Sequence, residues 1–566
     1  MQIRTEFPNP REQRAVWQPL NGWWDFRFQE EAEYTRKINV PFAYQCELSG
    51  INDQTVHNEV WYRREVELTE QLQSSKRVVL KFLACDYETT VWVNGQFATS
   101  HRGGYGAFSA DITKLLKPTG PQLLEVRVYD DLSKEVARGK QDWRVEPKNC
   151  WYYQTTGIWQ SVWLEGYGDD YITNMRITPD LRTTSAEIEV ELADGTADWV
   201  FAKVTTPNGK VHEFGCSTQH NKRVKLQTSY TRPCPFYDTH VWTPENPKLW
   251  TVQLTLQKDG QVVDTVDTYF AFRKIHAANG QIYLNDVPVK FRLVLDQGYW
   301  RKGGMTAPSH ECYKEDILIA KKYGFNGARK HQKLEDPYFY YYADQLGFFT
   351  WAETPSAYAF CSREVQEIAQ LQCELVQRVY NNPSVVAYVP FNESWGIKEV
   401  LNDPAQQAVA QSMYYLCKSL DQTRLVVTND GWENLGVTDL VGVHDYSAFG
   451  DNFERDYAVP QDHFCPAGRR IMAEGHTIGE KPVMLTEFGG ISVVSANGGW
   501  GYGGAVDTED KFFERLDAQM ENLKKTSFVG WCYTQLTDVE QETNGLLDAD
   551  HVPKFSDERM ENKFNQ

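Results

Sequence analysis

The chain has 566 residues, enough for about three or four domains of ordinary size. Its 58 Lys and Arg against 77 Asp and Glu give a formal net charge of −19, which repels a nucleic-acid backbone and an anionic membrane surface. We therefore exclude nucleic acid as a partner. The 18 Trp, 30 Tyr and 28 Phe, on a chain of negative mean hydropathy, predict aromatic surfaces that bind flat or ring-shaped ligands.

The N-terminal segment from Met1 to Pro8 has no apolar stretch of the kind found in a signal peptide. No other stretch reaches the about 18 apolar residues of a membrane span. We therefore expect a cytoplasmic protein that does not bind membranes. The eleven cysteines are scattered and include no CxxC pair, so we expect reduced thiols rather than disulfides or a zinc site.

Short alternating runs fill the first part of the chain. Between Leu20 and Trp163 they are broken by Gly, Pro and Asn, as where the turn pair Asn94-Gly95 follows the run from Thr90 to Val93. A period of two residues with such turns is typical of antiparallel strands. The pattern predicts a β sandwich over residues 1–170.

A second set of short strands runs from about Tyr171 to Phe272. Glu187 to Leu192 and Thr251 to Leu256 are clear examples of its alternation. About a hundred residues of such strands predict an immunoglobulin-like sandwich, which we place at 171–273.

Over residues 274–566, apolar strand-like runs alternate with helical segments. The eight runs are Val289 to Leu295, Phe325 to Lys330, Phe348 to Glu353, Val385 to Asn392, Leu425 to Asn429, Val441 to Asp445, Pro482 to Glu487 and Val529 to Gln535. Candidate helices between them include Glu315 to Tyr323, Arg363 to Val379 and Asp510 to Lys525. Eight such repeats predict a (β/α)8 barrel, because an open doubly wound sheet usually needs fewer.

The fourth and seventh of these runs are each closed by a glutamate, Glu393 and Glu487. A carboxylate after so apolar a strand is costly unless it faces a polar cavity, and the mouth of a barrel provides one. Two carboxylates on opposite walls of one pocket are what retaining glycoside hydrolysis needs. We expect burial to keep Glu393 protonated as the acid and hydrogen-bond donors to keep Glu487 ionised as the nucleophile. The alternative is that each glutamate is a strand-end residue in an ion pair.

With these residues in view, the chain resembles glycoside hydrolase family 2, the family of β-galactosidases, β-glucuronidases and β-mannosidases. Asn392-Glu393 is similar to the family's acid/base motif, and Glu487 in Thr-Glu-Phe-Gly-Gly to its nucleophile. The runs Leu20 to Phe26 and Thr156 to Glu165 resemble the family's sugar-binding sandwich. The resemblance implies a jelly-roll sandwich, an immunoglobulin-like sandwich and a barrel, with an exo-acting, retaining mechanism and no cofactor or metal.

The same placement suggests residues that bind the sugar. We expect Asn392 to hydrogen-bond the 2-hydroxyl. By resemblance, Tyr446 donates to the nucleophile and Trp531 stacks on the sugar ring. For both aromatics, core packing is the alternative. Further sugar-binding candidates at the barrel mouth are Asp296, Glu353, Trp395 and Asp430.

A cationic cluster, Arg329, Lys330, His331 and Lys333, follows the second strand run. In an acidic protein such a cluster at the site would attract an anionic group such as a uronic acid carboxylate. The alternative is that the lysines neutralise acidic neighbours or face solvent.

The loop after the eighth strand run argues the other way. Family glucuronidases hold the substrate carboxylate there with Asn-x-Lys, whereas this chain has Glu542-Thr543-Asn544. A hexuronidase would need another clamp, for which Arg329 and Lys330 are the candidates. We favour a β-hexuronide (glucuronide or galacturonide) as substrate, with a β-galactoside as the alternative and another β-glycoside as a third.

The rival class is a non-catalytic carbohydrate-binding protein, since β sandwiches and an aromatic cleft could serve that role. In either case we expect a small glycoside or oligosaccharide as the partner and, by analogy with the family, a homo-oligomer. The glycine-rich run from Gly499 to Gly504 lacks the acidic partner of a dinucleotide site, and we interpret it as an aromatic loop at the active site.

Overall fold

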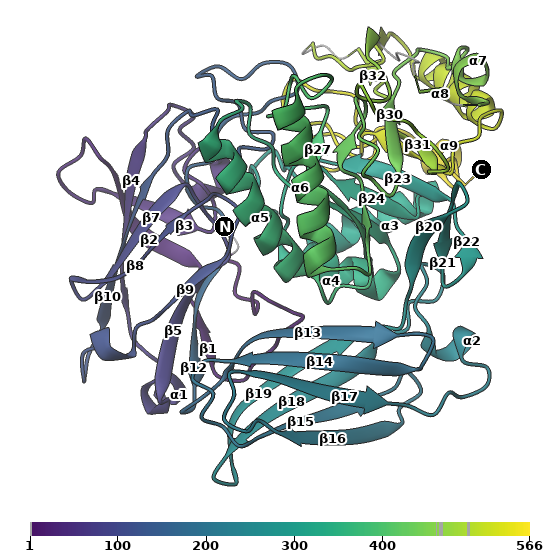
Figure 1. The fold of residues 1–566 in the computed structure, drawn as a ribbon. Helices are drawn as coiled ribbons and strands as arrows, with labels where there is room; N and C mark the ends of the chain where they lie inside the picture. Colours follow the sequence, from purple (N-terminus) through teal and green to yellow (C-terminus); the bar gives the residue numbers. More distant parts are fainter. Residues whose placement is uncertain (1–2, 460, 463–467, 495–497, 566) are drawn as a thin grey trace.

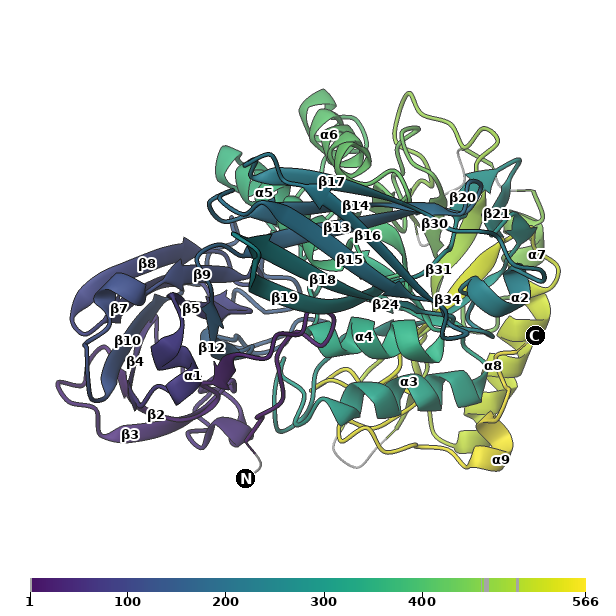
Figure 2. The same cartoon turned by 90° about the horizontal axis from the view of Figure 1, so that it is seen from below.

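The computed structural model describes residues 3–459, 461–462, 468–494 and 498–565. The chain forms two β sandwiches and a helix-covered barrel, in that order along the sequence (Figure 1). Both sandwiches lie against the barrel, as the two views in Figures 1 and 2 agree. The predicted fold class is confirmed.

The first sandwich pairs a six-stranded with a four-stranded antiparallel sheet. The larger sheet has the order β3 (Arg36–Val40), β2 (Gly22–Phe28), β4 (Glu59–Val66), β10 (Gln122–Tyr129), β7 (Glu88–Val93) and β8 (Gln96–Arg102). The smaller has the order β1 (Trp17–Pro19), β12 (Val162–Tyr167), β5 (Arg77–Phe82) and β9 (Phe108–Asp111). Alternate side chains of β10 are buried, and with Trp24, Phe26 and Leu80 they belong to one apolar core.

The second sandwich has seven strands in two antiparallel sheets. One has the order β13 (Ile172–Asp180), β14 (Ser185–Leu192) and β17 (Arg223–Ser229), and the other β16 (Val211–Ser217), β15 (Trp199–Thr205), β18 (Trp250–Lys258) and β19 (Gln261–Phe270). Residues such as Ile188 and Leu254 face inward between the sheets, while charged residues alternate with them outside. This is the pattern of an immunoglobulin-like sandwich.

Eight parallel strands build the barrel, in the order β28 (Leu425–Val426), β26 (Val385–Val389), β25 (Phe349–Glu353), β24 (Gly327–Lys330), β23 (Phe291–Asp296), β34 (Gly530–Thr534), β31 (Val483–Gly489) and β30 (Val441–His444). Short strands β27 (Phe391–Asn392) and β29 (Asn429–Asp430) continue the fourth and fifth strands toward the mouth. Between the ends of the sheet, the His444 N–H donates to the Gly431 carbonyl oxygen at 3.1 Å.

Helices cover the outside of the barrel. They are α3 (Glu311–Tyr323), α4 (Pro337–Leu346), α5 (Ser362–Val379), α6 (Pro404–Leu420), α7 (Phe453–Tyr457), α8 (Glu509–Leu523) and α9 (Asp557–Met560). Inward-facing side chains such as Leu293, Trp351 and Met484 fill the barrel interior, so polar groups are left to the mouth.

The remaining elements are short. They are β6 (Cys85–Asp86), β11 (Gly157–Ile158), β20 (Ile275–Ala278), β21 (Gln281–Leu284), β22 (Val287–Pro288), β32 (Ser492–Val493), β33 (Ala505–Val506), α1 (Glu70–Ser74) and α2 (Tyr237–His240), with 3-10 turns η1 (Glu47–Ser49) and η2 (Thr113–Leu115). Among the described residues, no helix combines the length and apolar character needed to cross a membrane.

Candidate active site

Glu393 and Glu487 meet at the carboxyl ends of the barrel strands. Glu487 lies within β31, and Glu393 comes directly after β27. The backbone of Glu393 has φ +52°, which is strained for a residue with a Cβ, and its N–H donates to the Asp430 carbonyl oxygen at 2.8 Å. Both side chains are mostly buried, with 13% of Glu393 and 5% of Glu487 exposed.

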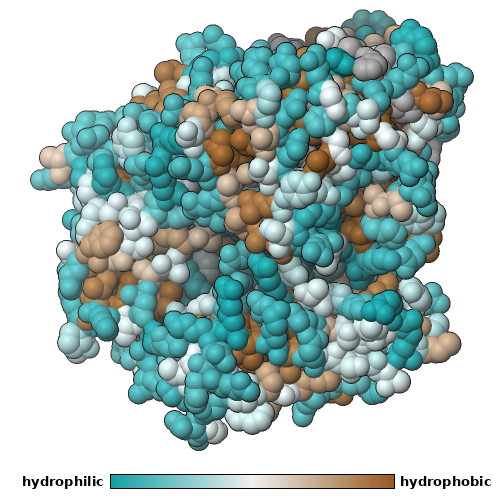
Figure 3. All heavy atoms as spheres, viewed as in Figure 1, coloured by the Kyte–Doolittle hydropathy of each residue, from teal (hydrophilic) through white to brown (hydrophobic). Residues whose placement is uncertain are grey.

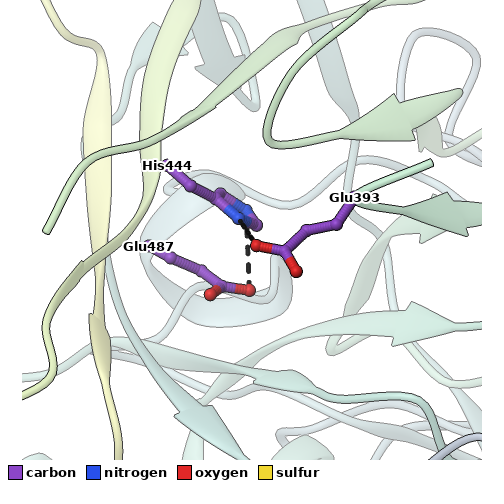
Figure 4. A group of neighbouring side chains, drawn as sticks. All are labelled: Glu393, His444 and Glu487. Atoms are coloured by element: carbon purple, nitrogen blue, oxygen red, sulfur yellow. Dashed lines mark hydrogen bonds and ion pairs between the residues drawn. The ribbon is translucent and has the colours of Figure 1, made fainter. Parts of the chain in front are cut away.

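His444 stands between the two glutamates, as Figure 4 shows. Its Nδ1 is 2.9 Å from Glu393 Oε1, and its Nε2 is 3.5 Å from Glu487 Oε1. The same Nε2 is 3.2 Å from Asp430 Oδ2. Sequence reasoning missed this histidine, although it is the last residue of β30 and lies two residues before Tyr446.

The charges around His444 set its protonation. Burial alone would lower the pKa of His444, but Glu487, Asp430 and Glu393 outweigh it and raise that pKa to about 10. The site therefore holds an imidazolium near neutral pH. Glu393, His444 and Glu487 are grouped closely enough to bind a metal ion, which would have to displace a proton from His444.

The expectation that Glu393 is protonated in the free site is wrong. Burial opposes ionisation of Glu393, but the hydrogen bond and charge of His444 lower its pKa. The physical reason is the buried cation beside it, which the sequence pattern did not reveal. The proton that acid catalysis needs is therefore held by the His444 and Glu393 pair, with His444 as its resting place.

Arg329 organises the floor of the site. Its side chain is fully buried and forms ion pairs with Glu353 at 2.7 Å, Asp430 at 2.8 Å and Glu487 at 3.3 Å. It also donates to Asn392 Oδ1 at 3.0 Å, which leaves the buried Nδ2 of Asn392 without a partner among the described residues. That amide is available to donate to a sugar hydroxyl.

The nucleophile candidate has a second donor. The Tyr446 hydroxyl donates to Glu487 Oε2 and lies 3.2 Å from the Thr534 hydroxyl. The Tyr502 ring, from the predicted aromatic loop, stacks on the Tyr446 ring with centroids 4.7 Å apart. Together with Arg329, these contacts hold the Glu487 carboxylate in one position.

The cationic cluster after β24 is neutralised within the protein. Lys330 pairs with Asp296 at 2.8 Å and Glu335 at 2.9 Å, and Lys333 pairs with the same Glu335 at 2.8 Å. Both lysines are 1% exposed. Contrary to the prediction, Arg329 and Lys330 do not attract a substrate anion, because their charges already face protein carboxylates.

Other predicted sugar ligands are also held by the protein. Arg329, His331 and the Gln332 N–H occupy the Glu353 oxygens, and these charges lower the pKa of Glu353 to about 2 against the effect of burial. Asp296 accepts from the Gly298 N–H at 2.8 Å besides its ion pair with Lys330. These carboxylates position the cations around them.

Of the two tryptophans predicted to contact the sugar, only Trp395 lies at the site. Its ring is 6.2 Å from that of His331 and 5.7 Å from that of Trp151. Trp531, in contrast, packs on the outside of the barrel against Phe488 and Phe564, with 1% exposed. The prediction for Trp531 is wrong, because strand alternation turns its side chain toward the helices.

The first sandwich supplies one wall of the site through residues 137–153. The N–H groups of Arg138 and Gly139 donate to the Ser356 carbonyl oxygen, at 3.0 and 3.1 Å, in the loop after β25. The Tyr152 hydroxyl donates to Glu542 Oε2 at 2.8 Å, in the loop after β34. These contacts place Trp151 and Lys140 beside Trp395.

Two sandwiches on a barrel that carries paired carboxylates at its mouth define a glycoside hydrolase architecture. Family models for the sugar-binding domain, the family 2 domain and the TIM barrel domain of glycosyl hydrolases family 2 match residues 11–166, 170–273 and 275–557. The chain belongs to glycosyl hydrolases family 2, as its sequence motifs predicted.

Relatives carry different activities in their names. A putative β-glucuronidase of Formosa agariphila is 23% identical over 75% of this chain and 51% of its own, and a β-galactosidase of Photobacterium profundum is 23% identical over 78% and 42%. The chain thus spans about half the length of the curated relatives it matches. A β-D-glucuronidase structure from Dictyoglomus thermophilum has a TM-score of 0.79 at 18% identity, covering 99% of this chain and 98% of that one, which shows the shared fold.

Proposed function

We propose that the protein is a retaining exo-β-glycosidase with Glu487 as nucleophile and Glu393 as acid/base. One observation carries the mechanism: an oxygen of Glu393 lies within 4.8 Å of an oxygen of Glu487. Retaining enzymes keep their carboxyl groups about 5 to 5.5 Å apart, whereas inverting enzymes need about 6.5 to 9.5 Å to admit a water molecule. The short separation supports direct attack by one carboxylate.

In the first step, Glu487 attacks the anomeric carbon while the oxygen of the leaving group takes the proton that His444 and Glu393 hold between them. The bond from the anomeric carbon to the glycosidic oxygen breaks as the bond to Glu487 forms. In the second step, Glu393 takes a proton from water, and that water displaces Glu487 with the β configuration kept. No cofactor enters either step.

Sugar contacts follow from the free groups at the site. The Asn392 Nδ2 faces no protein acceptor among the described residues, and we assign it to the 2-hydroxyl, where the contact strengthens in the transition state. The Trp395 ring offers an apolar face beside the carboxylates. Tyr446 and Arg329 hold the nucleophile rather than the sugar.

For the substrate we propose a β-D-hexuronide, supported by relatives named β-glucuronidase. A β-galactoside is the second candidate. Glu542 lies where the family's Asn-x-Lys motif would begin, and an ionised carboxylate there would repel the carboxylate of a uronide. This position therefore favours a neutral sugar. Several relatives are named β-galactosidase.

Substitution of the two glutamates tests the proposal. On nitrophenyl β-glycosides, we expect Glu393→Gln to lower kcat by about 10² to 10⁴-fold and Glu487→Gln by about 10⁴-fold or more. Glu315→Gln, at an exposed position of α3, is the matched control and keeps full activity. Two results would favour a carbohydrate-binding protein instead. One is full activity in both catalytic variants, and the other is a native chain that binds glycosides without cleaving them.

A further inference from the structure

Most positive charges around the paired glutamates are already neutralised. Arg329 faces three carboxylates, Lys330 faces two, and Lys333 faces Glu335 and two backbone carbonyl oxygens. His444 is bound to Glu393 and Asp430. None of these groups is free to meet a substrate anion.

Lys140 differs from all of them. It is 2% exposed, yet its ammonium group makes no hydrogen bond or ion pair with any residue that the structure describes. The Nζ atom lies over the rings of Trp395, at 5.2 Å, and Tyr152, at 5.6 Å. Because no described acceptor binds this ammonium group, its three donors are available to a ligand.

The backbone fixes this lysine at the site. Arg138 and Gly139, which precede it, donate to Ser356 of the barrel, and the Lys140 carbonyl oxygen accepts from the Tyr152 N–H at 2.8 Å. Gly139 has φ +58°, and a Cβ there would collide with the Gln332 carbonyl oxygen. The chain therefore enters the site in one conformation, with Lys140 presented from the first sandwich.

The field at Lys140 keeps the group charged. Burial alone lowers the pKa of Lys140, but Cys150, Glu542, Glu487 and Glu393 outweigh it and raise the pKa. The neighbouring Glu542 is fully buried, and its Oε1 has no partner among the described residues. Burial raises the pKa of Glu542, while the charge of Lys140 and the hydrogen bond from Tyr152 act in the opposite direction.

We propose that Lys140, contributed by the first sandwich, binds the carboxylate of the hexuronic acid and thereby determines substrate specificity. This inference rests on the proposed hexuronidase function. In this proposal Lys140, a cation from another domain, takes the place of the absent Asn-x-Lys element of the barrel. A compact ammonium and a carboxylate are matched in charge, and the burial of Lys140 strengthens such a pair.

Lys140→Met tests this assignment, because it keeps most of the side-chain volume and removes the charge. The measurement is kcat/KM for nitrophenyl β-D-glucuronide and β-D-galacturonide and for the matched β-D-glucoside and β-D-galactoside. We expect the uronide values to fall by about 100-fold, and by at least about tenfold more than the neutral ones. Lys148→Met, at an exposed lysine of the same segment, is the control and leaves all four values unchanged.

Inhibition by the free sugars provides a second test of the role of Lys140. In Lys140→Met and in Lys140→Gln, the inhibition constant of D-glucuronate should rise while that of D-glucose moves much less. Suppose that the native enzyme prefers uronides, but that the variants lose activity on uronides and neutral glycosides equally or keep both activities. This result overturns the role of Lys140 and leaves the hexuronidase proposal standing. A native enzyme that prefers neutral glycosides overturns both.

Discussion

At the residue scale, the unusual feature is a histidine between the nucleophile and the acid/base residue. His444 contacts Glu393 directly and Asp430 on its other side, and its pKa is raised to about 10. The proton of the reaction thus belongs to a pair of groups, and the pH profile reports on both.

Removing the charge of His444 should shift that profile. In the native pair the proton is lost only when His444 titrates, with a pKa of about 10, whereas in His444→Gln a carboxyl group alone must hold it. Since activity falls as the pair loses its proton, the alkaline limb of kcat/KM should move to lower pH, which a pH series on a nitrophenyl glycoside would measure. His220→Gln, at an exposed histidine, is the control.

An alkaline limb that instead moved to higher pH in His444→Gln would contradict this assignment. It would mean that Glu393 holds the proton itself and that His444 only lowers the pKa of Glu393. A profile unchanged in position would show that His444 does not interact with the acid at all.

Sequence reasoning pointed to both glutamates, Asn392 and Tyr446 because each lies at or just after the end of a barrel strand in a recognisable motif. It missed Lys140, which has no motif and reaches the site only by tertiary contacts. Tyr152 and Glu542, which help to place it, are 390 residues apart in the chain. It misjudged Trp531 because the motif did not settle the direction of that side chain.

At the scale of elements, periodicity predicted all eight barrel strands to within a few residues. The fourth predicted run, Val385 to Asn392, is divided into β26 and β27 at Pro390, which has no N–H to continue the ladder. The fifth is divided into β28 and β29 between Val426 and Asn429. Both breaks occur toward the mouth, where strands turn into catalytic loops.

The segment from 137 to 153 is the element that joins the first sandwich to the barrel mouth, and Gly139 is its tightest point. Gly139→Ala should lower the free energy of unfolding by about 1 to 2 kcal/mol from the left-handed backbone, with more from the collision. A shift of the segment by about 1 Å should also lower kcat/KM by about 100-fold. Thermal unfolding and kinetics measure the two effects.

Gly120→Ala separates backbone strain from the collision. Gly120 lies in the same sandwich with φ +79°, but a Cβ there has nothing within 4 Å. In this control the free energy of unfolding should fall by a similar amount from backbone strain, and the activity should be kept. Equal activity in both variants would show that the segment does not position the site.

At the scale of the whole molecule, the site is composite. The barrel supplies the reacting carboxylates and the first sandwich supplies Lys140 and Trp151. Composition predicted an acidic protein rich in aromatics, and four of these aromatics form two ring pairs near the barrel mouth, Trp151 with Trp395 and Tyr446 with Tyr502. The charge of −19 says little about the ligand, because we assign specificity to a single local cation, Lys140.

The central claim, that Glu393 and Glu487 act as a retaining pair, is tested most directly by the first product formed. Proton NMR during early hydrolysis of nitrophenyl β-D-glucuronide should show the β-anomer of glucuronic acid before mutarotation produces the α-anomer. The α-anomer appearing first would mean that water attacks directly, and it would contradict the account.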